Sequence, residues 1–155
     1  MTIDAALLVQ TPQLNLMLAW IWVAFGFGSG LLLGLFFHRE DWLGGYASLK
    51  RRLYRVGHIS FFGLGVLNLC FYLTVRHLPA TGSAVAVAAW AFVVGAIAMP
   101  LCCVAAAHAP RLRPLFAVPV LSLLLGGMLT AAVAAGSQPS IQDPQTATYK
   151  LQPAL

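Results

Sequence analysis

The sequence predicts an all-α integral membrane protein, a four-helix bundle in which every helix crosses the bilayer. Apolar residues make up 60% of the 155 residues, charged residues make up only 8%, and the mean hydropathy is +0.84. This composition leaves too little polar surface for a soluble protein. Four apolar stretches also reach the length of about 20 residues that a helix needs to cross a hydrocarbon core of about 30 Å. Together they use most of the chain, so we expect a single membrane domain over residues 1–155.

The first span is expected at residues 16–37, after a segment in which Pro12 turns the chain into the membrane. Gly26, Gly30 and Gly34 recur every four residues within this span. They therefore share one helix face, on which a second helix can approach closely. Packing within the bundle is the simpler interpretation of this face, and docking onto a neighbouring subunit is the alternative.

The second span is expected at residues 58–75, and it contains Asn68. An amide at membrane depth needs a hydrogen-bond partner, which we expect on an adjacent helix. The third span covers residues 84–107 and the fourth covers residues 115–135. Residues 136–155 have the Pro, Gln, Ser and Thr content of an extended tail.

A charged segment at residues 38–58 separates the first two spans. Gly44 and Gly45 permit a sharp reversal of the chain, and residues 46–58 form a short basic amphipathic helix. Lys and Arg beside Trp and Tyr are typical of contact with anionic lipid headgroups at a membrane surface. We therefore expect the basic cluster at residues 50–52 to face the headgroups.

The basic residues indicate how the chain is inserted, because seven of the nine Lys and Arg lie in the first and third loops. These seven are Arg39, Lys50, Arg51, Arg52, Arg55, Arg111 and Arg113. The positive-inside rule places both loops in the cytoplasm and both termini outside, as in a multi-pass protein of the bacterial inner membrane. The same topology explains the net charge of +5, so nucleic acid is not an expected partner.

Three histidines fall at the predicted cytoplasmic boundary, where His38 closes the first span, His58 opens the second and His108 closes the third. Imidazoles at one depth could ligate a haem iron, bind another metal ion or relay protons to a quinone. For a haem, His58 and His108 would be the iron ligands, while Arg39 and Arg55 could pair with the propionates. Because imidazole is amphipathic and suits helix ends, an interfacial role without a cofactor is the simpler alternative.

Two segments, GLLLGLFFHRE at residues 30–40 and HISFFGLG at residues 58–65, resemble small bacterial membrane proteins that are distantly related to haem-copper oxidase subunit I. The resemblance covers a minor part of the chain and implies the role of haem ligand for His58 alone. A copper-site pattern is not recognisable here, so the resemblance does not imply an oxygen-reducing centre.

No catalytic residue is predicted, because all four acids lie outside the apolar spans and no phosphate-binding loop, nucleophile elbow or zinc-protease motif is present. We expect a non-catalytic accessory subunit of a respiratory or photosynthetic electron-transfer complex. Such a subunit would dock on other membrane subunits and support a b-type haem or a quinone at its cytoplasmic side. A cofactor-free structural or assembly protein is the alternative, and a small-molecule or lipid transporter is the third hypothesis.

Overall fold

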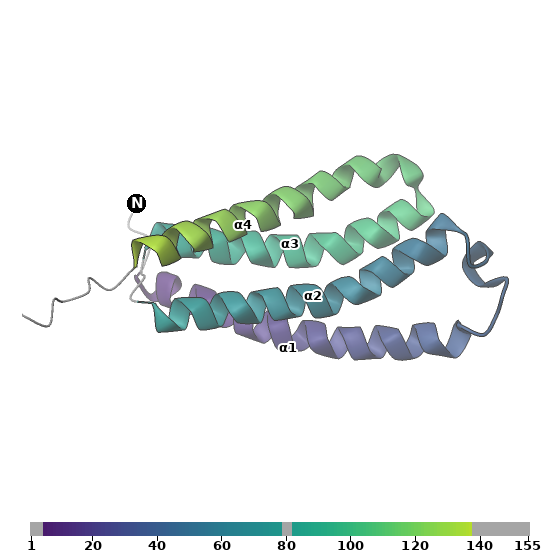
Figure 1. Cartoon of the computed structure of the whole chain (residues 1–155), viewed down its shortest axis with the longest axis horizontal. Helices are drawn as coiled ribbons and strands as arrows, with labels where there is room; N and C mark the ends of the chain where they lie inside the picture. Colours follow the sequence, from purple (N-terminus) through teal and green to yellow (C-terminus); the bar gives the residue numbers. More distant parts are fainter. Residues whose placement is uncertain (1–4, 79–81, 138–155) are drawn as a thin grey trace, which may run out of the picture.

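Four long helices lie side by side in the computed structural model, which describes residues 5–78 and 82–137 (Figure 1). They are α1 (Ala5–Phe36), α2 (Leu49–His77), α3 (Ser83–His108) and α4 (Ala117–Gly136), with the short 3-10 helices η1 (Trp42–Gly44) and η2 (Pro110–Phe116) in the connections. All four long helices have the length and apolar composition to cross a membrane. The predicted four-span, all-α fold is therefore confirmed.

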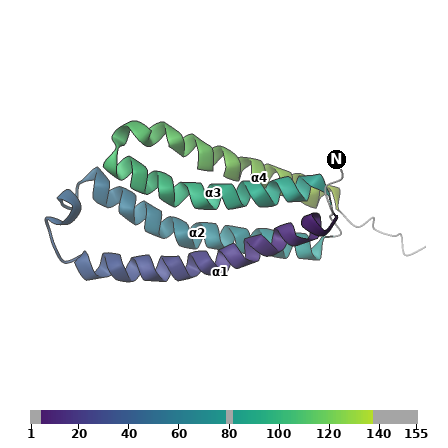
Figure 2. The same cartoon turned by 180° about the vertical axis from the view of Figure 1, so that it is seen from behind.

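The helices form a row in which α1 contacts α2, α2 contacts α3 and α3 contacts α4, with a further contact between α1 and α3. Figure 2 shows the same row from behind. The buried core lies between α2 and α3, where Phe71 packs against Phe92, and α4 covers it. Large apolar side chains stay exposed on the outer helices, with Phe27 69% and Met128 65% exposed. These side chains suit contact with lipid rather than water.

The connections α1–α2 and α3–α4 lie at one end of the bundle, which we call the basic end (Figure 1). The described parts of both chain ends lie at the opposite end, which we call the terminal end. Loop charge correctly indicated that both basic loops share one end, whereas the membrane side that this end faces stays a prediction. Of the predicted tail at 136–155, residues 138–155 lie outside the described residues.

Two helices begin earlier than the sequence pattern predicted. α1 starts at Ala5 and continues through Pro12, so the expected turn at this proline is wrong. Membrane helices tolerate proline because neighbouring groups satisfy the freed carbonyl. α2 starts at Leu49 rather than at residue 58, because the Ser48 hydroxyl caps the helix by accepting a hydrogen bond from the Arg51 N–H at 3.2 Å. The basic stretch and the second span are therefore one continuous helix.

Polar side chains tie three helices together in the terminal half of the bundle. The Asn15 amide of α1 donates to Asn68 Oδ1 of α2 at 2.8 Å and to the Ala89 carbonyl of α3 at 3.2 Å. Both asparagines are fully buried. The predicted partner of Asn68 on an adjacent helix is confirmed, and this partner is Asn15.

A second tie between α1 and α3 depends on a proline. Pro100 lacks an N–H and cannot supply the helical hydrogen bond to the carbonyl four residues earlier, that of Ala96. Trp22 of α1 supplies the missing hydrogen bond, because its indole Nε1–H donates to the Ala96 carbonyl at 3.1 Å. One helix thus satisfies a backbone group that the other leaves free.

The glycine face of α1 packs within the bundle at two of its three positions. A Cβ atom added at Gly26 would lie 2.7 Å from the Phe62 ring, and one added at Gly30 would lie 2.8 Å from the His58 ring. A Cβ atom at Gly34 would meet nothing within 4 Å. The predicted close approach of a second helix is therefore confirmed at Gly26 and Gly30, where the helix is α2.

Candidate functional site

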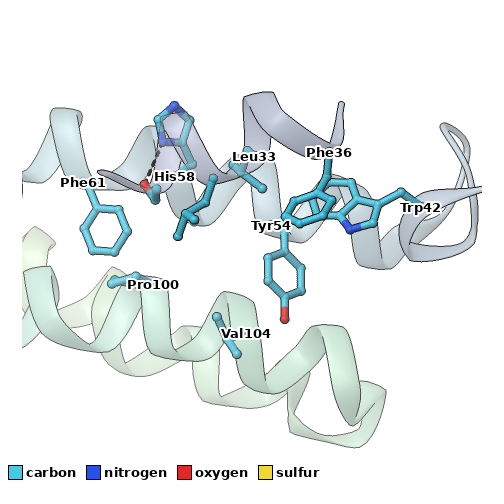
Figure 3. A pocket seen from close by; sticks show the side chains of 11 residues that line it. Leu33, Phe36, Trp42, Tyr54, His58, Phe61, Pro100 and Val104 are labelled. Carbon is cyan, nitrogen blue, oxygen red and sulfur yellow. Dashed lines mark hydrogen bonds between the residues drawn. The ribbon is translucent and has the colours of Figure 1, made fainter. Parts of the chain in front are cut away.

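A pocket of about 360 Å³ lies between α1, α2 and α3 towards the basic end (Figure 3). Its lining consists of Ser29, Leu32, Leu33 and Phe36 from α1, Trp42 from η1, Tyr54, Gly57, His58 and Phe61 from α2, and Pro100 and Val104 from α3. The volume falls within the range of about 300–1,000 Å³ that is usual for small-molecule sites. Because the walls are predominantly apolar and aromatic, we treat this pocket as the candidate site.

One face of α2 supplies the base of the pocket. Tyr54, Gly57, His58 and Phe61 are spaced at i, i+3, i+4 and i+7, which places them on the same side of a helix. Gly57 also permits close packing, since a Cβ atom there would lie 3.3 Å from Cys103 Cβ of α3. The sequence therefore brings an imidazole, a phenol and a phenyl ring together through helical spacing alone.

His58 is half-buried, and the side chain of Ser29 fixes its orientation. The Ser29 hydroxyl donates to the Gly26 carbonyl at 3.1 Å and lies 3.0 Å from His58 Nδ1, the contact drawn as the dashed line at His58 in Figure 3. When the one hydroxyl hydrogen lies on the Gly26 carbonyl, Nδ1–H donates to the Ser29 oxygen and the lone pair is on Nε2; when that hydrogen lies on Nδ1, the N–H is at Nε2. Among the described residues, Nε2 has no hydrogen-bond partner. His58 thus offers one ring nitrogen, Nε2, which is an acceptor in the first of these tautomers.

Tyr54 connects the pocket with His108, the last residue of α3. The Tyr54 hydroxyl lies 2.9 Å from His108 Nε2, and the two rings meet edge to face with their centroids 6.1 Å apart. Figure 3 shows the phenol at the pocket wall with its hydroxyl directed towards α3. His108 is exposed. The pair therefore joins an apolar pocket to the surface at the basic end.

The predicted site residues are distributed unequally around this pocket. His58 lines the pocket and His108 reaches it through Tyr54, but no contact within the described residues joins the two histidines directly. His38, Arg39 and Arg55 are exposed and lie outside the lining. The placement of His58 at the opening turn of its span is wrong, because α2 begins at Leu49. Whether His58 and His108 bind iron stays a prediction.

Cys102 and Cys103 are buried free thiols, as expected of small apolar residues. In residues 5–78 and 82–137, no group of three His, Cys, Asp or Glu side chains gathers where it could hold a metal ion.

Arg51 is the most informative residue that the sequence pattern misplaced. Its guanidinium is fully buried, donates to the Phe37 carbonyl at 2.9 Å and lies 3.8 Å from the centre of the Tyr46 ring. Contact of the whole basic cluster with lipid headgroups is therefore wrong for Arg51. The cation is stable here because the carbonyls that end α1 and the faces of aromatic rings both carry partial negative charge.

The groups around the Arg51 guanidinium also fix one wall of the pocket. We call them the Arg51 cage, and they are the carbonyls of Phe37 and Arg39 and the rings of Phe37, Trp42 and Tyr46. The guanidinium lies 5.7 Å from the centre of the Trp42 ring, and Trp42 stacks on Phe36 with the ring centres 5.8 Å apart. Both rings line the pocket. The predicted reversal at Gly44 and Gly45 is confirmed by their φ values of 84° and 88°, and Tyr46, which follows it, returns to the end of α1, where its hydroxyl donates to the Phe37 carbonyl at 3.2 Å. Aromatic residues on both sides of a short loop were the signal for this cage.

A second pocket, of about 290 Å³, lies in the terminal half of the bundle, and we call it the terminal groove. It is lined by Leu67, Cys70, Phe71 and Thr74 from α2, Phe92 from α3, and Gly127, Thr130, Ala131 and Ala134 from α4. Its hydroxyl groups are engaged with their own helices, since Thr74 bonds to the Cys70 carbonyl and Thr130 bonds to the Gly126 carbonyl. The lining of the terminal groove therefore contains no hydroxyl–imidazole pair like that of Tyr54 and His108.

Comparison with models of protein families, with curated proteins and with solved structures gives no match for this chain.

Proposed function

We propose that this four-span membrane protein is a non-catalytic accessory subunit of an electron-transfer complex and supports a haem or a quinone at its cytoplasmic side. The observation that carries the proposal is the pocket at the basic end, where His58 and the Tyr54–His108 pair meet an apolar, aromatic lining. Redox cofactors of membranes have flat rings that pack against such a lining. Their polar edges need a few polar side chains that hydrogen-bond to them and fix their orientation.

The chemistry of His58 fits a haem ligand. Ligating imidazoles commonly donate their second N–H to an oxygen, which holds the ring in place and leaves the other nitrogen for the metal. His58 has this arrangement, with Nδ1 on Ser29 and Nε2 free. Arg39 and Arg55 would be available to propionates. A bound haem would supply reversible one-electron transfer, and this chain's residues would set its orientation and its surroundings.

The partial resemblance to proteins related to haem-copper oxidase subunit I supports the same class of function, since it assigns a ligand role to the residue at position 58. Other membrane subunits are the proposed partners. Large apolar residues are exposed on the outer surfaces of α1 and α4, and these surfaces would meet either such partners or lipid.

The test is to purify the protein in mild detergent together with whatever co-purifies, and to record its visible spectrum and its extracted quinones. The proposal expects redox-active partners and either a Soret band or bound quinone. His58→Ala should remove the cofactor signal, whereas His38→Ala, which changes an exposed histidine outside the pocket, should not. Protein without partners, Soret band or quinone would contradict the proposal and favour a cofactor-free structural protein.

A further inference from the structure

The geometry points to a quinone as the ligand of the basic-end pocket, with one ring oxygen at the Tyr54–His108 pair and its apolar tail in the bilayer. This inference rests on the proposed function and chooses between its two cofactors. It depends on the shape and lining of the pocket, on the hydrogen-bonding capacity of Tyr54 and on the position of the opening.

The lining suits a flat ring of moderate size. Aromatic side chains come from three elements, with Phe36 on α1, Trp42 on η1, and Tyr54 and Phe61 on α2. Flat rings pack well against aromatic faces in offset or edge-to-face arrangements. The pocket volume of about 360 Å³ lies near the lower limit for small-molecule sites, which favours a single ring over a larger macrocycle.

Tyr54 and His108 can bind either redox form of a quinone. When His108 Nε2 carries a proton, it donates to the Tyr54 oxygen, and the phenol hydrogen is free for a quinone carbonyl. When Nε2 carries a lone pair, it accepts the phenol hydrogen, and the Tyr54 oxygen can accept from a quinol hydroxyl. The exposed position of His108 allows it to take either tautomer.

The path for the tail lies between α1 and α3. Hydrogen bonds from Asn15 and Trp22 hold these helices together nearer the terminal end. At the pocket, Leu32 of α1 and Val104 of α3 both line the cavity and are themselves exposed on the outer surface. In a membrane that surface meets lipid, so an isoprenoid tail can leave the pocket without crossing a polar layer.

The first arm of the test fills the pocket. The purified protein, with its co-purifying partners, is placed in phosphatidylcholine vesicles, and binding of a benzoquinone with a ten-carbon alkyl tail is measured. Val104→Phe should weaken binding by about tenfold or more, because the larger ring occupies ligand space. The matched control is Val94→Phe, which changes an equally exposed α3 valine outside both pockets and should leave affinity within about twofold.

The second arm removes only a hydroxyl. Tyr54→Phe should weaken binding of the same quinone by about three- to tenfold, the usual value of one hydrogen bond. Tyr72→Phe is its control, since that phenol accepts a hydrogen bond from Arg76 in the terminal half. If Val104→Phe fails to fold, this arm alone decides, and unchanged binding to the Tyr54→Phe protein would overturn the inference.

The outcomes separate this inference from the function on which it rests. A Soret band in a complex that does not bind the quinone would uphold the proposed function and overturn the quinone assignment. Quinone binding that is sensitive to Val104→Phe and Tyr54→Phe, in a protein without redox partners, would support the ligand and contradict the subunit role.

Discussion

The two halves of the bundle use the space between α1 and α3 in opposite ways. Asn15 of α1 in the terminal half and Trp22 of α1 near the middle of the bundle donate to carbonyls of α3. In the basic half, the same two helices enclose a pocket, and α2 places His58 and Tyr54 beside it. The terminal half uses its polar side chains to fix the fold, whereas the basic half leaves hydrogen-bonding capacity at His58 Nε2 and at the Tyr54–His108 pair.

This difference suggests how a small membrane protein can keep a site open. In lipid the hydrophobic effect does not drive helices together, so interhelical hydrogen bonds and close packing determine where they make contact. The Asn15 and Trp22 contacts both lie on the terminal side of the pocket, so α1 and α3 can remain apart at the pocket itself. The Arg51 cage then holds the loop that closes the outer wall.

The largest effect is expected at Arg51. Arg51→Ala removes two hydrogen bonds to carbonyls and three cation–π contacts, so it should lower the free energy of unfolding by about 3 kcal/mol. Thermal unfolding in detergent and limited proteolysis of the α1–α2 loop would measure the change. Arg52→Ala, an exposed neighbour, is the control. Equal melting temperatures for the two variants would contradict the cage.

Arg51→Lys sharpens the same point. An ammonium group lacks the planar fork that spans two carbonyls and stacks on rings, so lysine should recover less than half of the lost stability. Full recovery would mean that positive charge alone matters at this position.

A smaller change in the free energy of unfolding is expected along the glycine face of α1, which packs on α2 at Gly26 and Gly30 but not at Gly34. Gly30→Ala should lower stability by about 1–2 kcal/mol, because the new methyl group meets the His58 ring. Gly34→Ala, one helical turn further on, should change stability by less than about 0.5 kcal/mol, because nothing lies within 4 Å of its Cβ position. Chemical unfolding of the two variants measures both values. Equal losses would show that the face is packed throughout.

The smallest effect concerns the tie between Trp22 and Ala96. Trp22→Phe should cost about 1 kcal/mol, because the Ala96 carbonyl loses its donor. In a Pro100→Ala background the same substitution should cost less than half as much, because the new backbone N–H can bond to Ala96. A double-mutant cycle of unfolding free energies measures this coupling. Additive effects would disprove the link between the proline and the indole.

The sequence was sufficient for the features that depend on local pattern. Hydropathy located all four spans, the four-residue glycine spacing predicted that a second helix approaches the first closely, and the amide of Asn68 predicted a polar partner. These predictions succeed because each rests on what one segment must do in an apolar solvent.

The features that the sequence did not predict depend on segments that meet only in the fold. Charge clusters are normally solvated, so nothing local distinguished the buried Arg51 from the exposed Arg52. Tyr54 and His108 are 54 positions apart, and their hydrogen bond exists because α3 packs beside α2. The pocket has the same origin, because its lining comes from four elements.

The most direct test of the difference between the two halves is photolabelling with a benzoquinone that carries an azido group on the ring and a ten-carbon tail. Labelled protein in vesicles is digested, and the modified residues are mapped by mass spectrometry. We expect labels on residues 29–36, 54–61 and 100–104, and we expect excess unlabelled quinone to compete them away. Competable labels on the terminal groove, at residues 67–74 and 127–134, with none at the basic end, would contradict the account.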